Sequence, residues 1–208
     1  MIQKLKLLLI PLFMILGILI YLLIAGEQES KEVREGVVRF HVVANSDSLE
    51  DQKLKLQLRD GLFSTIEALF ADCADRQEAL KKAEDHKEFL EQEGERILGS
   101  LGSEQPVRVL VGERFFPTKT YGALSFPAGN YQAVSVAIGE GKGENFWCVL
   151  YPALCLSPAV SDGESESKMA LAVGEEATDF LRKEGQIPKI KFRLVEWYEL
   201  LIKKFKNS

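Results

Sequence analysis

The stretch that decides the fold is VVRFHVVANSDSLEDQKLKLQLRDGLFSTIEALF, residues 37–70, where the hydrophobic repeat changes from two residues to four. At its start, apolar residues alternate with Arg39 and His41, a pattern that predicts a strand over residues 37–44. We therefore expect His41 to lie on a partly exposed face of this strand. The polar run NSDS, residues 45–48, then ends the strand.

A helical hairpin is predicted next. Ser48 and Asp51 have the S-x-x-D spacing of a helix start, and a large apolar residue recurs at every fourth position from Leu54 to Phe70. A second helix is expected over Arg76–Leu98, because its apolar residues fall at helical spacing and glycine follows it. Both helices are expected to turn one apolar face toward the core.

After Pro106 the period returns to two, so the second half of the chain is mainly β. Alternating valines begin a strand at Val107, another strand ends near Ile138, and the apolar run Phe146–Tyr151 is typical of a buried strand. Strands grouped after a helical pair predict an α+β fold. We expect an N-terminal strand and helical hairpin packed on a mainly antiparallel sheet, with a C-terminal strand and helix, and a main domain over residues 34–156.

The C-terminal part is expected to add smaller elements. Residues 157–188 are interpreted as an acidic linker and a variable helix, because Ser157–Ser167 is rich in serine and acidic residues and Lys168–Leu181 suits a helix. Residues 189–208 are expected to form a strand over Lys189–Val195 and a last helix, both belonging to the main domain.

The N-terminus carries an export signal. Lys4 and Lys6 precede Leu7–Ile24, a run of 18 residues without a charged or strongly polar side chain. Residues 1–26 are therefore predicted to be a signal peptide or a signal anchor. Cleavage is left open, because Leu23 is larger than the residue that signal peptidase prefers at this position. Lysines before the apolar run orient the rest of the chain outside the cytoplasm.

Composition argues against several kinds of site. The formal net charge is −5 and no basic tract precedes the last predicted helix, so nucleic acid is not expected as a partner. The three cysteines and two histidines form neither C-x-x-C nor a histidine pair at i, i+4, so no metal or other cofactor is expected. Cys148 and Cys155 are close in a chain that leaves the reducing cytoplasm, which favours a disulfide; two buried thiols are the alternative.

Catalytic motifs are weak. The run GEGKG, residues 139–143, lacks the spacing of a phosphate-binding loop and is followed by a strand, so a hairpin turn is expected. His41 is the one plausible general base, with Asp47 and Asp51 nearby in the sequence, but no G-x-S-x-G nucleophile motif accompanies it. An envelope hydrolase that uses His41 and these acids is therefore kept only as an alternative.

Aromatic residues crowd the turn-rich segment ERFFPTKTYGALSFPAGNYQ, residues 113–132. Its prolines and glycines predict a loop that displays Lys119 and Tyr121, and aromatic residues with a cation suit a protein contact. Phe116 and Phe126 have the same two interpretations as the whole segment, a core plug or a binding surface.

Three segments together resemble the stage II sporulation protein R family: RFHVVANSDSLEDQKLKLQLRD (39–60), FFPTKTYGALSFPAGNYQAVSVAIGEGKGENFWCVLYPALC (115–155) and KFRLVEW (191–197). The resemblance implies a protein exported across the forespore membrane into the space between two membranes. There it would be secreted, or anchored by residues 7–24. Nothing is carried over to residues 157–188, which match no pattern of this family.

The resemblance also implies a function. Members of this family activate a membrane-embedded aspartic protease of the mother cell, which then processes the pro-form of sigma factor E, so the chain is expected to be a signalling ligand and not an enzyme. A structural envelope protein is the other alternative. The resemblance does not identify contact residues. From the aromatic segment, the first strand and the turn after it, the expected partner-binding residues are Lys119, Tyr121, Phe116, Phe126, His41 and Asp47. Asp47 also suits a purely structural turn.

Overall fold

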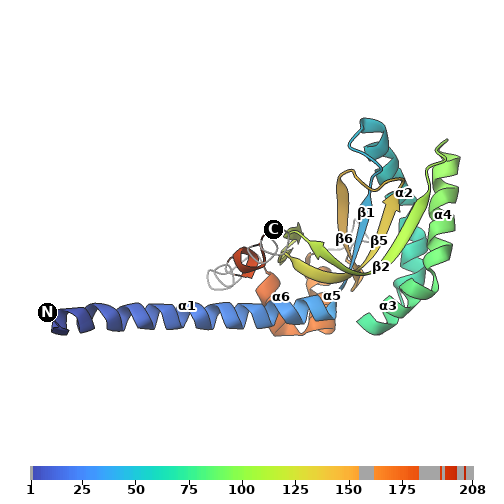
Figure 1. The fold of residues 1–208 in the computed structure, drawn as a ribbon. Helices are drawn as coiled ribbons and strands as arrows, with labels where there is room; N and C mark the ends of the chain where they lie inside the picture. Colours follow the sequence, from blue (N-terminus) through green and yellow to red (C-terminus); the bar gives the residue numbers. More distant parts are fainter. Residues whose placement is uncertain (1, 155–161, 183–192, 194, 201–203, 205–208) are drawn as a thin grey trace.

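The computed structural model describes residues 2–154, 162–182, 193, 195–200 and 204 (Figure 1). In chain order its elements are α1 (Ile2–Gly36), β1 (Val38–Val43), α2 (Leu49–Phe70), α3 (Arg76–Asp85), α4 (Lys87–Ser100), β2 (Val107–Phe116), β3 (Lys119–Tyr121), β4 (Leu124–Phe126), β5 (Gly129–Ile138), β6 (Asn145–Tyr151), α5 (Asp162–Val173) and α6 (Glu175–Leu181).

A four-stranded sheet in the order β2-β5-β1-β6 forms the centre of the domain. β1 pairs parallel with β5 and antiparallel with β6, and β2 pairs antiparallel with β5. The predicted α+β class and mainly antiparallel sheet are therefore confirmed. The sequence predicts an N-terminal strand that packs against the sheet, but β1 is one of the interior strands of the sheet. Phe40 of β1 pairs with Val134 of β5 on one side and with Cys148 of β6 on the other.

Both faces of this sheet are covered. Helices α2, α3 and α4 pack on one face, against alternate strand residues such as Phe40 (Figure 1). On the other face, the end of α1, helices α5 and α6, and the β3–β4 hairpin enclose a second core that contains Phe116. The expectation that His41 is partly exposed is wrong: His41 is 8% exposed and Arg39 is fully buried, because the second core covers their face.

The predicted helical hairpin is present with one change. α2 begins as expected, since the side chain of Ser48 accepts a hydrogen bond from the backbone N–H of Asp51 at 3.1 Å. The second predicted helix, Arg76–Leu98, is wrong as a single element. His86 adopts φ −107° and ψ 11°, outside the helical region, and divides it into α3 and α4.

The contact between α4 and β2 protects one edge of the sheet. Gly94 permits this close approach, because an added Cβ would lie 2.8 Å from the side chain of Val107. Glu91 of α4 accepts a hydrogen bond from the backbone N–H of Val109 at 2.8 Å. An edge N–H that is already bonded is unavailable to another strand, so this contact limits edge-to-edge pairing.

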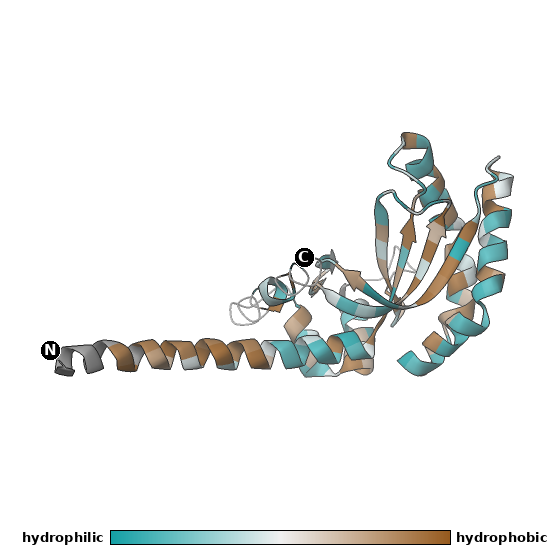
Figure 2. Ribbon diagram, viewed as in Figure 1, coloured by the Kyte–Doolittle hydropathy of each residue, from teal (hydrophilic) through white to brown (hydrophobic). Residues whose placement is uncertain are grey.

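α1 is one continuous helix that runs through the predicted cleavage region to Gly36. Its apolar part projects away from the domain, and Tyr21 in that part is 68% exposed (Figures 1 and 2). The segment Leu12–Gly36 is long and apolar enough to cross a membrane, a property that signal sequences share. Its last turns pack on the domain, where Ser30 and Val33 are fully buried.

The stretch predicted as an acidic linker is helical from Asp162, where α5 begins. The linker prediction is wrong for these residues because α5 is amphipathic: Met169 is fully buried, whereas Glu166 lies on the outer side and accepts a hydrogen bond from Arg182 at 3.0 Å. The single helix predicted for Lys168–Leu181 is divided into α5 and α6 by Gly174, whose φ is 86°.

Most of the predicted strand Lys189–Val195 lies outside the described residues. Arg193 and Val195 are described and are helical, so the strand prediction is wrong there. Val195 is fully buried, and the described helical residues 195–200 agree with the predicted last helix.

Candidate functional site

Arg39 lies at the centre of the candidate site. From β1 its side chain enters the second core, where the guanidinium carbon lies 4.7 Å from the ring centre of Phe116 and 5.0 Å from that of Phe126. The rings of Tyr121 and Tyr131 lie 5.5 and 5.1 Å away. Contacts of a cation with aromatic rings contribute about 2 kcal/mol or more when desolvated. The predicted contact residues Phe116, Tyr121 and Phe126 are therefore brought together around one buried cation.

The hydrogen bonds of Arg39 leave part of its guanidinium unpaired. Nε donates to the carbonyl oxygen of Cys148 at 3.0 Å, and Nη2 donates to the hydroxyl of Tyr121 at 3.1 Å. Nη1 is buried and has no hydrogen-bond partner within the described part of the chain. Burial lowers the pKa of Arg39, and the tyrosine hydroxyls oppose this shift. The aromatic rings thus hold a cation that no described carboxylate neutralises.

His41 lies beside this group on the same strand. Its ring stacks on Trp147, with ring centres 5.1 Å apart and planes 6° apart, and meets the edge of Phe116 at 5.4 Å. Nδ1 lies 3.0 Å from the side-chain oxygen of Asn145, and Nε2 lies 2.5 Å from the hydroxyl of Ser135. Burial lowers the pKa of His41, so the neutral ring is favoured at pH 7.

The hydrolase alternative requires His41 to act with Asp47 and Asp51. In the structure Asp47 accepts from the backbone N–H of Glu144 at 2.7 Å, and Asp51 bonds to Asn45 and other polar groups, so neither acid orients the His41 ring. Among the described residues, no group of three or more histidine, cysteine or acidic side chains is placed to hold a metal ion. The described geometry therefore offers no acid–base pair at His41.

The outer side of the site is formed by Lys119, Tyr121 and Trp147, which we call the hairpin surface. All three side chains are partly exposed, and the ammonium nitrogen of Lys119 lies 5.9 Å from the ring centre of Trp147. The prediction of a display loop is wrong, because Lys119–Tyr121 and Leu124–Phe126 pair as the strands β3 and β4. The hairpin and the neighbouring β6 thus form a fixed platform that can meet a partner with a cation and two aromatic rings.

Phe116 and Phe126 lie beneath this platform and are fully buried. Phe116 and Phe126 are therefore core residues, which is one of the two interpretations of the aromatic segment. Of the four predicted residues in this segment, only Lys119 and Tyr121 can form a binding surface. The sequence did not single out Arg39 or Trp147. For Arg39 the signal lay in strand alternation, because an interior strand is buried on both faces; Trp147 lies on the edge strand β6, so this reason does not apply to it.

Asp47 belongs to a different part of the domain, a loop that fixes the connection between β5 and β6. Besides the bond from Glu144 to Asp47, the side-chain oxygen of Asn45 accepts from the backbone N–H of Glu140 at 2.9 Å. Gly139 and Gly141 adopt φ values of 57° and 61° in this connection. A hairpin turn is the wrong description of GEGKG, because β1 lies between β5 and β6 and its following loop supplies these bonds.

The cysteine prediction is only partly within the described residues. Cys148 is 2% exposed in the first core, whereas Cys155 lies outside the described residues, so their disulfide stays a prediction. Cys73 is a free thiol, and burial raises its pKa.

Comparison with known proteins agrees with the resemblance seen in the sequence. Residues 34–161 match the family described as Stage II sporulation protein R (spore_II_R). The chain is also 31% identical over 188 residues to Stage II sporulation protein R of Bacillus subtilis (strain 168), covering 83% of this chain and 84% of that protein. The chain therefore belongs to the stage II sporulation protein R family. No solved structure gives a significant match.

Proposed function

We propose that this chain is an exported signalling ligand that activates a membrane aspartic protease of the mother cell during sporulation. The activated protease would then process the pro-form of sigma factor E. The observation that carries this proposal is membership of the family, whose match over residues 34–161 includes the whole sheet and the hairpin surface. The exposed apolar part of α1 supports delivery across the forespore membrane, as a signal peptide or as an anchor.

A ligand role fits the character of the site better than catalysis does. His41 is buried and is separated from the acids that a hydrolase would use. By contrast, Lys119 and Tyr121 are partly exposed on the paired strands β3 and β4, and Trp147 is partly exposed on β6. Aromatic and cationic side chains on a rigid support are typical anchors of protein interfaces.

Activation by such a ligand is a shift between two states of the protease. The ligand must bind the active arrangement more tightly than the inactive one, since equal affinity for both would shift nothing. In this proposal Lys119 and Tyr121 contact the protease, while Phe116, Phe126 and His41 support the platform from beneath. Asp47 fixes the β5–β6 connection and need not touch the partner.

Reconstitution tests this function. Purified residues 27–208 are added to membranes that contain the protease and its pro-protein substrate, with a sample lacking the protease in parallel. We expect the pro-protein to be processed only when the purified domain and the protease are both present. Processing without the protease would favour the hydrolase alternative, and no effect on the protease would favour a structural envelope protein.

A further inference from the structure

A short helical segment near the C-terminus, residues 195–200, is held against the domain by one of its faces. Glu196 accepts a hydrogen bond from the hydroxyl of Thr118 at 2.8 Å. Glu199 lies 3.6 Å from Nη1 of Arg34, near the end of α1. These contacts attach the segment both to the residue before β3 and to the helix that leads to the N-terminus.

The opposite face of this segment, which we call the free face, is exposed to solvent within the described part of the chain. Trp197 is 62% exposed, Leu200 is 50% exposed and Tyr198 is 39% exposed. Lys204 is also helical and exposed. Two further lysines and no acidic residue lie among the final residues of the sequence.

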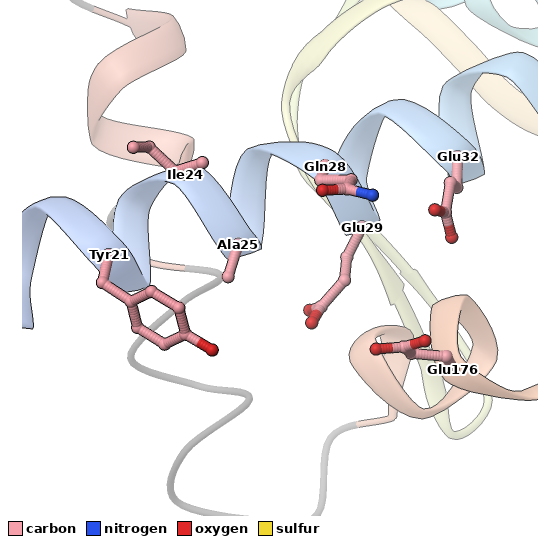
Figure 3. Close-up of a pocket in the computed structure, with 7 residues that line it drawn as sticks. All are labelled: Tyr21, Ile24, Ala25, Gln28, Glu29, Glu32 and Glu176. Atoms are coloured by element: carbon pink, nitrogen blue, oxygen red, sulfur yellow. The ribbon is translucent and has the colours of Figure 1, made fainter.

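This free face lies where α1 changes from apolar to acidic. Figure 1 shows the segment, in red, at the edge of the domain from which the apolar part of α1 projects. Figure 3 shows the transition itself: a pocket of about 320 Å³ has Tyr21 and Ile24 at one end and Glu29, Glu32 and Glu176 at the other. Because carboxylates are strongly disfavoured in hydrocarbon, the surface of a membrane entered by α1 would lie near this transition.

We propose that the free face of residues 195–200, together with Lys204, rests on the surface of the membrane that α1 enters. Trp197 and Tyr198 then lie at headgroup depth, where such amphipathic rings concentrate. Lys204 contacts anionic phospholipid headgroups, which attract basic residues next to a membrane. The contact orients the domain relative to the bilayer, a role that does not depend on the proposed activation of a protease.

Quenching by brominated lipid tests this contact in the full chain. The chain has two tryptophans, so the difference between the native protein and Trp197→Phe reports on Trp197. Both proteins are reconstituted into vesicles of phosphatidylglycerol and phosphatidylcholine, with and without bromine on the acyl chains. We expect bromine to reduce the emission of the native protein but not that of Trp197→Phe, and we expect weaker quenching in pure phosphatidylcholine.

A matched control separates membrane contact from simple exposure. In the Trp197→Phe protein, Leu49→Trp adds an exposed tryptophan at the start of α2, beyond the end of β1 that is farther from α1; Leu49 is 92% exposed. Bromine should not quench that emission. The proposal is overturned if bromine leaves the emission of Trp197 unchanged, or if that emission responds only to protein concentration, which would indicate contact with a second copy.

Discussion

At the scale of single residues, Asp51 joins the loop before α2 to Gln105, which lies 54 residues away in the sequence. Its carboxylate accepts from Asn45 at 2.9 Å, from Ser46 at 2.5 Å and from Gln105 at 2.9 Å. These hydrogen bonds, that of Gln105 foremost, lower the pKa of Asp51 to about 2. The charged form is therefore stabilised in the folded protein relative to the unfolded chain.

Asp51 should contribute to stability in a pH-dependent way. Its folded pKa lies below the unfolded value of about 4, so the contribution is present above pH 4 and is lost as the pH falls toward about 2. We expect Asp51→Asn to lower the free energy of unfolding at pH 7 by about 2 kcal/mol and to flatten its decline in acid. Urea titrations across this range measure both effects. Asp60→Asn, on the same helix with a side chain 61% exposed, is the control, and identical curves for the two variants would contradict the account.

Arg39 gives a second prediction at this scale. Lysine keeps the charge but has no planar fork that can stack within four rings while bonding both Cys148 and Tyr121. We expect Arg39→Lys to lower the free energy of unfolding by about 2 kcal/mol in urea titrations. Arg108→Lys is the matched control, because the side chain of Arg108 is exposed and donates to the carbonyl oxygen of Gly139. If the two variants lose the same free energy of unfolding, the aromatic rings do not distinguish arginine from lysine.

The sequence predicted single residues well only where a local rule applied. The Ser48 cap follows from a four-residue pattern, and the structure contains it. Arg39 and His41 lie on the predicted face of β1, but their burial depends on β3, β4 and α6, which lie many residues away in the sequence. The hydrophobic period of β1 does not show which distant elements cover this face. The burial of Arg39 and His41 at the centre of the site therefore could not be predicted from the local sequence.

At the scale of elements, the same limit applies to helix breaks and strand order. The four-residue period predicted α2 in full, yet the break at His86 has no proline or glycine to announce it. The placement of β1 between β5 and β6 likewise depends on pairing across the chain. The C-terminal alternation was too short to distinguish a strand from a helix, and Val195 belongs to a helix.

The predicted disulfide joins Cys148 in β6 to Cys155, which follows this strand in the sequence. We expect Cys148 and Cys155 to be joined in the exported protein, closing a short loop and contributing roughly 2 kcal/mol in the chain-entropy account. Mass spectrometry of non-reduced digests decides this, and Cys73 provides an internal control because it is a free thiol. Recovery of both residues as free thiols from freshly exported protein would rule out the bond.

α1 gives a prediction about delivery. Its apolar part projects from the domain, while Ser30 and Val33 in its last turns are buried. Replacement of residues 1–26 by an unrelated cleavable signal keeps the docked turns, so we expect processing of the sigma factor to continue. Immunoblots of the processed factor and of the secreted domain measure the two steps separately. Loss of processing despite normal secretion would make the native segment part of the signal.

At the scale of the whole molecule, the sheet separates two hydrophobic cores. One face packs on α2, α3 and α4 and forms a structural core. The other carries the buried Arg39 group beneath the hairpin surface and receives the end of α1. The central claim is that this second side engages and activates the protease.

The most direct measurement is protease activation by Lys119→Ala and Tyr121→Ala domains in the reconstituted membranes. Truncation of an interface anchor costs about 2 kcal/mol in binding, or roughly a thirtyfold rise in the concentration needed, whereas an unpartnered surface lysine contributes less than about 0.5 kcal/mol. Lys142→Ala is the control, because the side chain of Lys142 is 75% exposed in the β5–β6 connection. With melting temperatures equal to that of the parent, we predict this rise for both hairpin variants and none for Lys142→Ala. Activation by both hairpin variants at the parental concentration would contradict the account.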